Sequence, residues 1–155
     1  MLFRSDALRV IGAEPLDIGT RFAEDVIVSL PDSLLRAQAI FEETGGLHAA
    51  AAFDADGTIV AVREDVGRHN AVDKVVGTLF QEQRLPAGDL GLMVSGRASF
   101  ELVQKALVGG FPLMAAVGAP SSLAVELARE FNVTLVGFLR GGSYNVYSGE
   151  ERIYA

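Results

Sequence analysis

The sequence predicts an α/β fold, a three-layer α/β/α sandwich built around a mixed sheet. Short apolar segments alternate with segments whose apolar residues recur at helical spacing, and glycine or proline stands at most of the junctions between them. An Asp-Gly turn also joins two strand-like segments near the start of the chain. Strands separated by single helices pair in parallel, whereas strands joined by a tight turn pair antiparallel, so the sheet should contain both kinds of pairing.

The first 30 residues are irregular in pattern, because Gly12, Pro15 and Gly19 interrupt them. We expect residues 1–30 to be a lead-in or linker from a preceding region, with a single short strand over residues 25–30. Residues 31–155 should then form one α/β domain.

The elements of this domain follow from local signals. The first helix should begin at Asp32 or Ser33, either of which can cap it, and end at the pair Gly45 and Gly46. Strands over residues 48–53 and 58–63 should flank the Asp-Gly turn. Further helices are expected from residue 68 to about residue 83, over residues 100–108 and over residues 123–131. Further strands are expected over residues 90–94, 112–117 and 133–138, with an edge strand over residues 144–147.

Composition excludes several classes of function. The chain has 155 residues, no cysteine, two histidines and a net charge of −7. Without cysteine it has no disulfide and no thiolate nucleophile, and with two histidines a structural zinc site is not expected. The negative charge argues against nucleic-acid and anionic-membrane partners. Its longest apolar run, residues 49–53, is too short to span a bilayer, and no secretory signal follows Met1, so we expect a cytoplasmic protein.

Four polar loops each follow an apolar segment directly, and they form the candidate site. They cover residues 63–74, 95–99, 119–122 and 140–143. The carboxyl ends of parallel strands meet at one edge of an open sheet, where ligands bind, and the helix starts there present backbone N–H groups to anions. The sequence therefore predicts an anion site, with phosphate as the natural ligand.

Two arginines of these loops stand at helix starts, where a cation is disfavoured. Arg68 has Asp65 and Glu64 close by in sequence, so either an internal carboxylate or a bound anion could compensate its charge. No acid precedes Arg97 nearby, which favours the bound anion for that residue.

The two histidines each have two interpretations. His69 and Asp73 are four residues apart on one helix face, and they are either an ordinary surface pair or a supporting pair that orients the imidazole for hydrogen bonding or proton transfer. His48 opens an apolar strand and is either a core histidine or a site residue.

Four segments, residues 44–51, 63–74, 95–105 and 135–147, together resemble the FdhD/NarQ family of formate dehydrogenase accessory sulfurtransferases, and the likeness extends over residues 6–153. The resemblance implies a protein that receives persulfide sulfur from a cysteine desulfurase and passes it to the molybdenum bis-molybdopterin guanine dinucleotide cofactor, which makes formate dehydrogenase active. It also implies a fold similar to cytidine deaminase. The zinc signature of that enzyme is absent, since Ala49 and Ala50 follow His48.

The resemblance and the loops together give the expected site. The family's cofactor-binding segment matches residues 138–143. The residues expected to bind the cofactor are Arg68, His69, Ser95, Gly96, Arg97, Ser121, Ser122, Phe138, Leu139, Arg140, Gly141, Gly142 and Ser143. No metal ligand and no catalytic residue is expected beyond the supporting pair His69 and Asp73.

The chain departs from the family at one point, because the family's persulfide cysteine lies upstream of the segment that matches residues 6–9. We therefore expect this chain to be the C-terminal, cofactor-binding domain, and to form a homodimer. A naturally cysteine-free member of the family is the alternative explanation. An alternative is a docking module for formate dehydrogenase or the desulfurase, with an apolar patch at Phe3, Phe22 or the edge from Tyr144 to Tyr147. A nucleotide hydrolase or deaminase is suggested by fold analogy alone.

Overall fold

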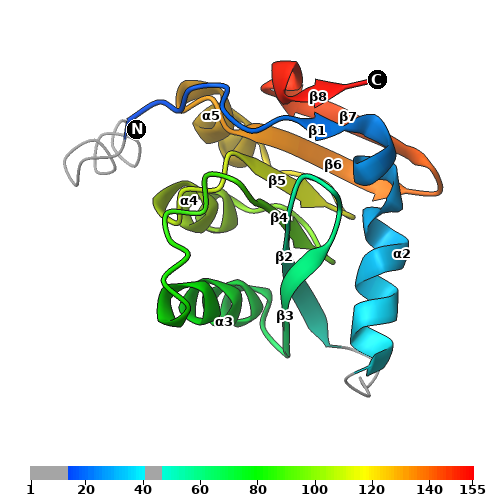
Figure 1. Ribbon diagram of the computed structural model, residues 1–155. Helices are drawn as coiled ribbons and strands as arrows, with labels where there is room; N and C mark the ends of the chain where they lie inside the picture. Colours follow the sequence, from blue (N-terminus) through cyan, green and yellow to red (C-terminus); the bar gives the residue numbers. More distant parts are fainter. Residues whose placement is uncertain (1–13, 41–46) are drawn as a thin grey trace.

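The computed structural model describes residues 14–40 and 47–155, which form a six-stranded mixed sheet with helices on both faces (Figure 1). The strand order is β3-β2-β4-β5-β6-β7. The strands of this sheet are β2 (His48–Phe53), β3 (Ile59–Asp65), β4 (Gly91–Val94), β5 (Leu113–Ala116), β6 (Thr134–Arg140) and β7 (Ser143–Ser148). The helices are α2 (Glu24–Ile40), α3 (Arg68–Gln81), α4 (Phe100–Val108) and α5 (Ser122–Glu130).

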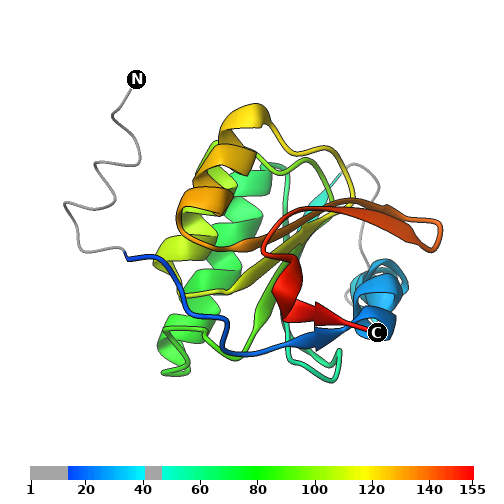
Figure 2. The ribbon, with the colours of Figure 1, turned by 90° about the horizontal axis from the view of Figure 1, so that it is seen from above.

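The helices divide between the two faces of the sheet. Helices α3, α4 and α5 lie on one face and α2 on the other, as Figures 1 and 2 show. Two separate cores result. The larger contains the inward residues of α3, α4 and α5, and the smaller packs α2 and Phe22 on the opposite face, where the rings of Phe22 and Phe53 meet edge to face at 5.6 Å. The predicted mixed α/β fold with three layers is confirmed.

Helix α2 corrects the expected start of the domain. The predicted strand over residues 25–30 is wrong, because α2 begins at Glu24 and continues through Pro31. Its residues Ile27, Leu30 and Leu34 recur at helical spacing and are all buried, and this burial outweighs the helix bond that proline cannot make. Residues 22–30 therefore belong to the packed fold and do not act as a linker. The predicted helix end at Gly45 and Gly46 lies outside the described residues.

The remaining elements agree with the predictions to within a few residues. Strands β2 and β3 form the expected hairpin, and the Asp54 carboxylate accepts hydrogen bonds from the backbone N–H groups of Asp56 and Thr58 in the turn. Strands β4, β5 and β6 pair in parallel, and β7 pairs antiparallel with β6 at the edge of the sheet.

A buried arginine joins the two ends of the described chain. Arg152 is 1% exposed and lies in the 3-10 turn η1 (Glu150–Arg152), just before β8 (Ile153–Tyr154), which pairs in parallel with β1 (Phe22–Ala23). Its guanidinium donates to the carbonyl of Ile18 at 2.7 Å, to the carbonyl of Asn132 at 2.6 Å, and to the carbonyl of Asp17. It also donates to the Thr134 hydroxyl at 3.1 Å. One side chain thus holds residues 17–18 against β6.

Strand directions bring the four predicted loops to one edge of the sheet. Strand β2 is antiparallel to both β3 and β4, so β3 runs in the same direction as β4, β5 and β6. The carboxyl ends of these four strands, and the amino end of β2, therefore share an edge. Within the described residues, no helix is both long enough and apolar enough to cross a bilayer.

Candidate functional site: a rim of loops at the strand ends

The loops at this edge contact one another directly, and we call them the rim: His48 with residues 65–69, 95–99, 117–122 and 138–143. The Gly118 N–H donates to the Gly96 carbonyl at 2.9 Å, and the Phe138 N–H donates to the Gly118 carbonyl at 3.1 Å. Ala98 and Pro120 form a parallel bridge between the same two loops. The loops that follow β4, β5 and β6 are therefore one hydrogen-bonded surface.

The β3–α3 loop joins this surface through histidine and serine. His69 Nε2 lies 3.4 Å from Ser99 Oγ, at the start of α4. His48 is adjacent to Gly96, because a β-carbon placed on that glycine would lie 3.4 Å from His48 Nδ1. The Ser95 hydroxyl accepts from the Ala49 N–H at 2.9 Å, which fixes the β4–α4 loop to β2. Both histidines thus lie in the rim.

Close backbone approach makes a glycine necessary in β6, directly before the rim residues 138–143. A β-carbon at Gly137 would lie 2.8 Å from Pro120 Cδ and 3.0 Å from Tyr147 Cε2, both closer than ordinary van der Waals contact. Gly137 therefore allows the β5–α5 loop to lie against β6, and it is needed for the shape of the rim.

Arg68 carries a buried polar atom without a partner. Its Nε is inaccessible to solvent and makes no hydrogen bond with any described residue. The carboxylates expected to compensate its charge are used elsewhere: Glu64 accepts from the Gln38 amide at 2.9 Å, and Asp65 pairs with Lys74 at 2.9 Å. Internal compensation of Arg68 by Asp65 or Glu64 is therefore wrong for the described part of the chain. No described residue pairs with the Arg68 guanidinium, and the residue as a whole is partly exposed, so its charge is available to an outside acceptor although Nε itself is covered.

The start of α3 differs from the starts of α4 and α5. Ser99 caps α4 by accepting from the Leu102 N–H, and Ser121 caps α5 by accepting from the Ala124 N–H. Gly67 precedes α3 and provides no side-chain cap. The first N–H groups of α3 are thus not capped by a side chain, and they lie beside Arg68, so the positive end of this helix adds to the positive charge of the rim.

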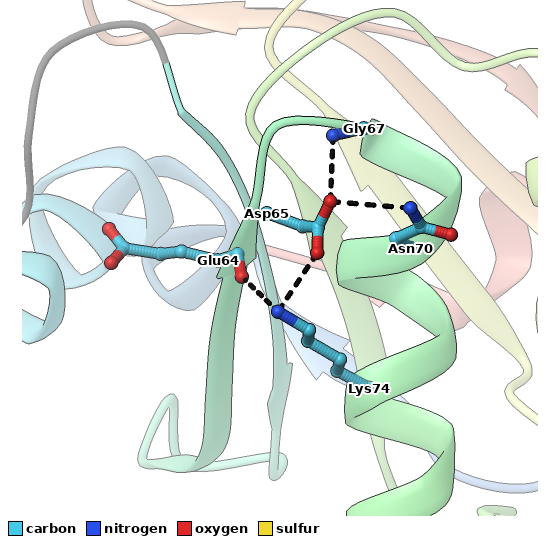
Figure 3. Close-up of polar contacts among 5 residues, drawn as sticks. All are labelled: Glu64, Asp65, Gly67, Asn70 and Lys74. Atoms are coloured by element: carbon cyan, nitrogen blue, oxygen red, sulfur yellow. Dashed lines mark hydrogen bonds and ion pairs between the residues drawn. The ribbon is translucent and has the colours of Figure 1, made fainter.

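Asp65 joins the end of β3 to the start of α3, as Figure 3 shows. One carboxylate oxygen accepts from the Gly67 N–H at 2.9 Å and from the Asn70 amide at 3.3 Å, and the other lies 2.9 Å from Lys74 Nζ. Lys74 also donates to the Glu64 carbonyl at 2.9 Å. These bonds, first the one from the Gly67 backbone and then those from Lys74 and Asn70, lower the pKa of Asp65 from 3.8 to about 2.

This shift predicts a pH dependence of stability. A carboxylate whose pKa is lower in the folded state stabilises the fold above its unfolded pKa, and the contribution disappears as the pH falls from about 4 to about 2. The Asp65→Asn variant should therefore lose less thermal stability than the wild type between pH 4 and pH 2. Melting temperatures measured across that interval would check this, and parallel curves for the two proteins would contradict it.

The other two arginines of the predicted site are exposed. Arg97 begins the turn before α4, and the Arg140 guanidinium lies 5.7 Å from the ring centre of Phe138. Phe138 has a φ of +53°, which is unusual for a bulky residue, and it lies where the β6–β7 pairing is irregular. Within the described residues neither Arg97 nor Arg140 forms an ion pair. The rim is thus locally cationic on a protein of net charge −7.

Several predicted site residues have roles other than the expected one. Asp73 does not bond His69, because its carboxylate pairs with Lys105 of α4 at 2.7 Å, so the supporting pair does not form, although both residues lie on one helix face. Leu139 is 1% exposed and packs in the smaller core, so only its backbone could meet a ligand. The hydroxyl of Ser121 caps its helix, and Ser122 is exposed at the helix start.

Gly141 and Gly142 form the tight turn between β6 and β7. Both have positive φ, at +62° and +80°, and they lie between the paired residues Arg140 and Ser143. Such a two-residue turn requires residues that tolerate the left-handed region, which explains the glycine pair. Sequence reasoning placed this segment in the site but did not identify it as a hairpin turn.

A groove that the sequence did not predict runs between α3 and α4. It has a volume of about 580 Å³, and its lining is largely apolar. Val76, Leu85 and Val108 form its apolar part, and His69 lies both in this groove and in the rim. The lining residues of α3 and of α4 recur at helical spacing within each helix. The sequence does not show that α3 packs beside α4, so it could not predict a groove between them. Among residues 14–40 and 47–155, no group of three His, Asp or Glu side chains could hold a metal ion.

The fold and rim define a class: an open mixed α/β sheet with arginine-bearing loops gathered at the carboxyl ends of its parallel strands. Within this class the family is clear, because residues 4–154 match the FdhD/NarQ family, and the chain belongs to that family.

The relatives found by comparison agree. The chain is 58% identical to a sulfur carrier protein FdhD of Nocardia farcinica over 96% of its own length and 53% of the relative. It is 49% identical to one of Sulfurisphaera tokodaii, over 89% and 54%. The crystal structure of a candidate formate dehydrogenase accessory protein from Desulfotalea psychrophila matches with a TM-score of 0.80 and 30% identity, over 92% of this chain and 59% of that one. The chain thus spans about half the length of the curated relatives it matches.

Proposed function

We propose that this chain is the cofactor-binding part of a sulfur-transfer protein that serves the maturation of formate dehydrogenase. In this proposal its cargo is the molybdenum bis-molybdopterin guanine dinucleotide cofactor, and the sulfur comes from a cysteine desulfurase as a persulfide. The sulfur-transfer role is supported by relatives named sulfur carrier protein FdhD. The cargo and the desulfurase are supported by the chemistry of the rim and by the resemblance of the motifs.

The observation that carries the proposal is the partly exposed side chain of Arg68, which no described residue pairs, beside a helix start that no side chain caps. A guanidinium without an acceptor costs free energy, and a phosphate oxygen at the accessible part of the group would supply an acceptor in a charge-assisted bond. The cargo offers phosphates and guanine groups, so its chemistry fits an arginine-rich rim.

Each part of the rim would contribute to binding. Arg68, Arg97 and Arg140 would hold phosphate oxygens, and the start of α5 at Ser121 and Ser122 would add hydrogen-bond donors. Residues 138–143 would border the ligand through Phe138 and the backbone of the glycine turn. His69, held near Ser99 at 3.4 Å, would orient either the ligand or an incoming thiol.

The chain itself has no thiol to carry sulfur, because it contains no cysteine. In the proposal the persulfide therefore belongs to a cysteine outside this sequence, and this chain binds the acceptor and orients it. A homodimer and a cytoplasmic location remain predictions.

Titration calorimetry with guanosine diphosphate tests the proposal. The wild-type chain should bind the nucleotide, and Arg97→Ala should weaken binding by about 1 kcal/mol or more, which is the size of a charge-assisted hydrogen bond. Arg84→Ala is the matched control, because Arg84 pairs with Asp89 at 4.0 Å and lies outside the rim. A folded wild-type chain that binds no guanosine diphosphate would refute the proposal.

A docking module for formate dehydrogenase or the desulfurase is the second candidate, and the groove between α3 and α4 favours it. The patches first expected for docking do not support it equally: Phe22 is fully buried, Phe3 lies outside the described residues, and Val146 is 36% exposed. Copurification with formate dehydrogenase, without nucleotide binding, would favour this second function.

A further inference from the structure

We infer that Asp65 is a positioning residue of the rim: its carboxylate holds the start of α3 so that Arg68 and the first N–H groups of the helix stay open to a phosphate. The inference rests on the proposed function, because it concerns the same anion site. It is not an obvious role for Asp65, since a carboxylate has the same charge as the ligand that the site is proposed to bind.

Asp65 bonds the turn before the helix and leaves the helix start uncapped. It accepts from the N–H of Gly67, the residue that precedes α3, at 2.9 Å, and from the side chain of Asn70 at 3.3 Å. Gly67 is followed by a helix start without any side-chain cap. An aspartate at position 67 would instead cap those N–H groups and compete with a ligand for them.

The charge of Asp65 is balanced within the same contacts. Lys74 Nζ lies 2.9 Å from one carboxylate oxygen and donates to the Glu64 carbonyl at 2.9 Å (Figure 3). The Asp65 side chain is 22% exposed, so this pair is partly shielded from solvent. Asp65 pairs with Lys74, and the Arg68 guanidinium has no carboxylate partner among the described residues, so its charge is available to a ligand.

The contacts also fix the turn relative to the next loop. Asp65 is the β-sheet partner of His48, and His48 lies against Gly96. Val66, between Asp65 and Gly67, is 77% exposed and packs little, so the bonds of the Asp65 carboxylate to Gly67 and Asn70 are important for holding this turn. Loss of the carboxylate would allow the α3 start to move away from the β4–α4 loop.

Two explanations of Asp65 predict opposite signs for the same experiment. If the carboxylate only adds negative charge near the site, its removal should strengthen the binding of an anion. If it positions the site, its removal should weaken binding, because the ligand must then order the turn itself. The sign of the change in affinity therefore separates them.

The experiment measures the dissociation constant of guanosine diphosphate by calorimetry, for the full chain and its Asp65 variants. Asp65→Ala removes every contact and should weaken binding about tenfold, whereas Asp65→Asn keeps an acceptor for Gly67 and should weaken it about threefold. The partial rescue by asparagine marks positioning, since a general loss of stability would leave the affinity of the folded fraction unchanged. All measurements are made well below the melting temperature of each variant.

Asp89→Asn is the matched control, because it removes the same charge from an exposed carboxylate that lies outside the rim, and its affinity should match the wild type. Unchanged or tighter binding by both Asp65 variants would overturn the inference while leaving the proposed function standing. Absence of binding by the wild type would overturn both. If Asp65→Ala does not fold, Asp65→Asn, which has nearly the same shape, decides the question by the same criterion.

Discussion

Replacement of Arg152 by methionine should lower the free energy of unfolding by about 3 to 5 kcal/mol. Arg152 is 1% exposed and donates to three backbone carbonyls and to the Thr134 hydroxyl. Methionine fills similar space but leaves these acceptors without a donor, and each unsatisfied buried group costs about 1–3 kcal/mol. Urea denaturation of the two proteins measures the difference.

Two further variants help to assign the loss of stability to the hydrogen bonds of Arg152. Arg129→Met is the control, because Arg129 donates a single bond to the Tyr147 carbonyl at 3.0 Å from an exposed position, and it should cost less than about 1 kcal/mol. Arg152→Lys should recover only part of the loss, since an ammonium group cannot reproduce the spread of a guanidinium. A loss below about 1 kcal/mol for Arg152→Met would show that water replaces the arginine contacts.

Replacement of Arg68 by methionine should weaken guanosine diphosphate binding by about 10- to 100-fold, which corresponds to about 1.4–2.8 kcal/mol. The same substitution should leave the ligand-free protein as stable as the wild type or more stable, by up to about 1 kcal/mol, because it removes a buried nitrogen that has no partner. Calorimetry and urea denaturation of the same preparation measure the two effects.

If Arg68→Met weakens nucleotide binding while it leaves the free energy of unfolding unchanged or raises it, Arg68 functions in ligand binding and not in stabilising the fold. A core residue would lose stability on truncation, and an ordinary surface residue would change neither quantity. If Arg68→Met binds the nucleotide as the wild type does, the anion site does not include this arginine, and the proposal loses the observation on which it chiefly depends.

The apolar periodicity of α3, α4 and α5, the helices on one face of the sheet, made them predictable from the sequence. Helix α2 on the other face was not predictable over its full length, because its sequence also carries strand and turn signals. Helix α4 begins and ends where its apolar period and flanking glycines indicate, at Phe100 and Val108. The sequence predicts α2 incorrectly, because Val26, Ile27 and Val28 resemble a strand and Pro31 resembles a helix start. Only the burial of that helix against the sheet, a tertiary effect, decides its conformation.

The location of the site was predictable from topology, but the partners of its side chains were not. Loops that follow parallel strands meet at one edge whatever their sequence, so the meeting of Gly96, Gly118 and Phe138 follows from strand order. Asp73 pairs with Lys105 of α4 and not with His69 of its own helix. This pairing depends on the packing of α4 on α3, which the spacing of residues along one helix cannot show. The likeness to the cytidine-deaminase fold stays a prediction.

The assembly of the rim has a consequence for how the protein is made. Its parts come from segments between residues 48 and 143, and the central pairing of β2 with β4 brings together strands separated by a helix along the chain. If the rim binds the proposed cargo, a nascent or partly folded chain cannot hold it, because most of the rim residues come together only when the last strands join the sheet. Cargo would therefore accumulate only on finished molecules and would shift the balance toward them in proportion to its supply.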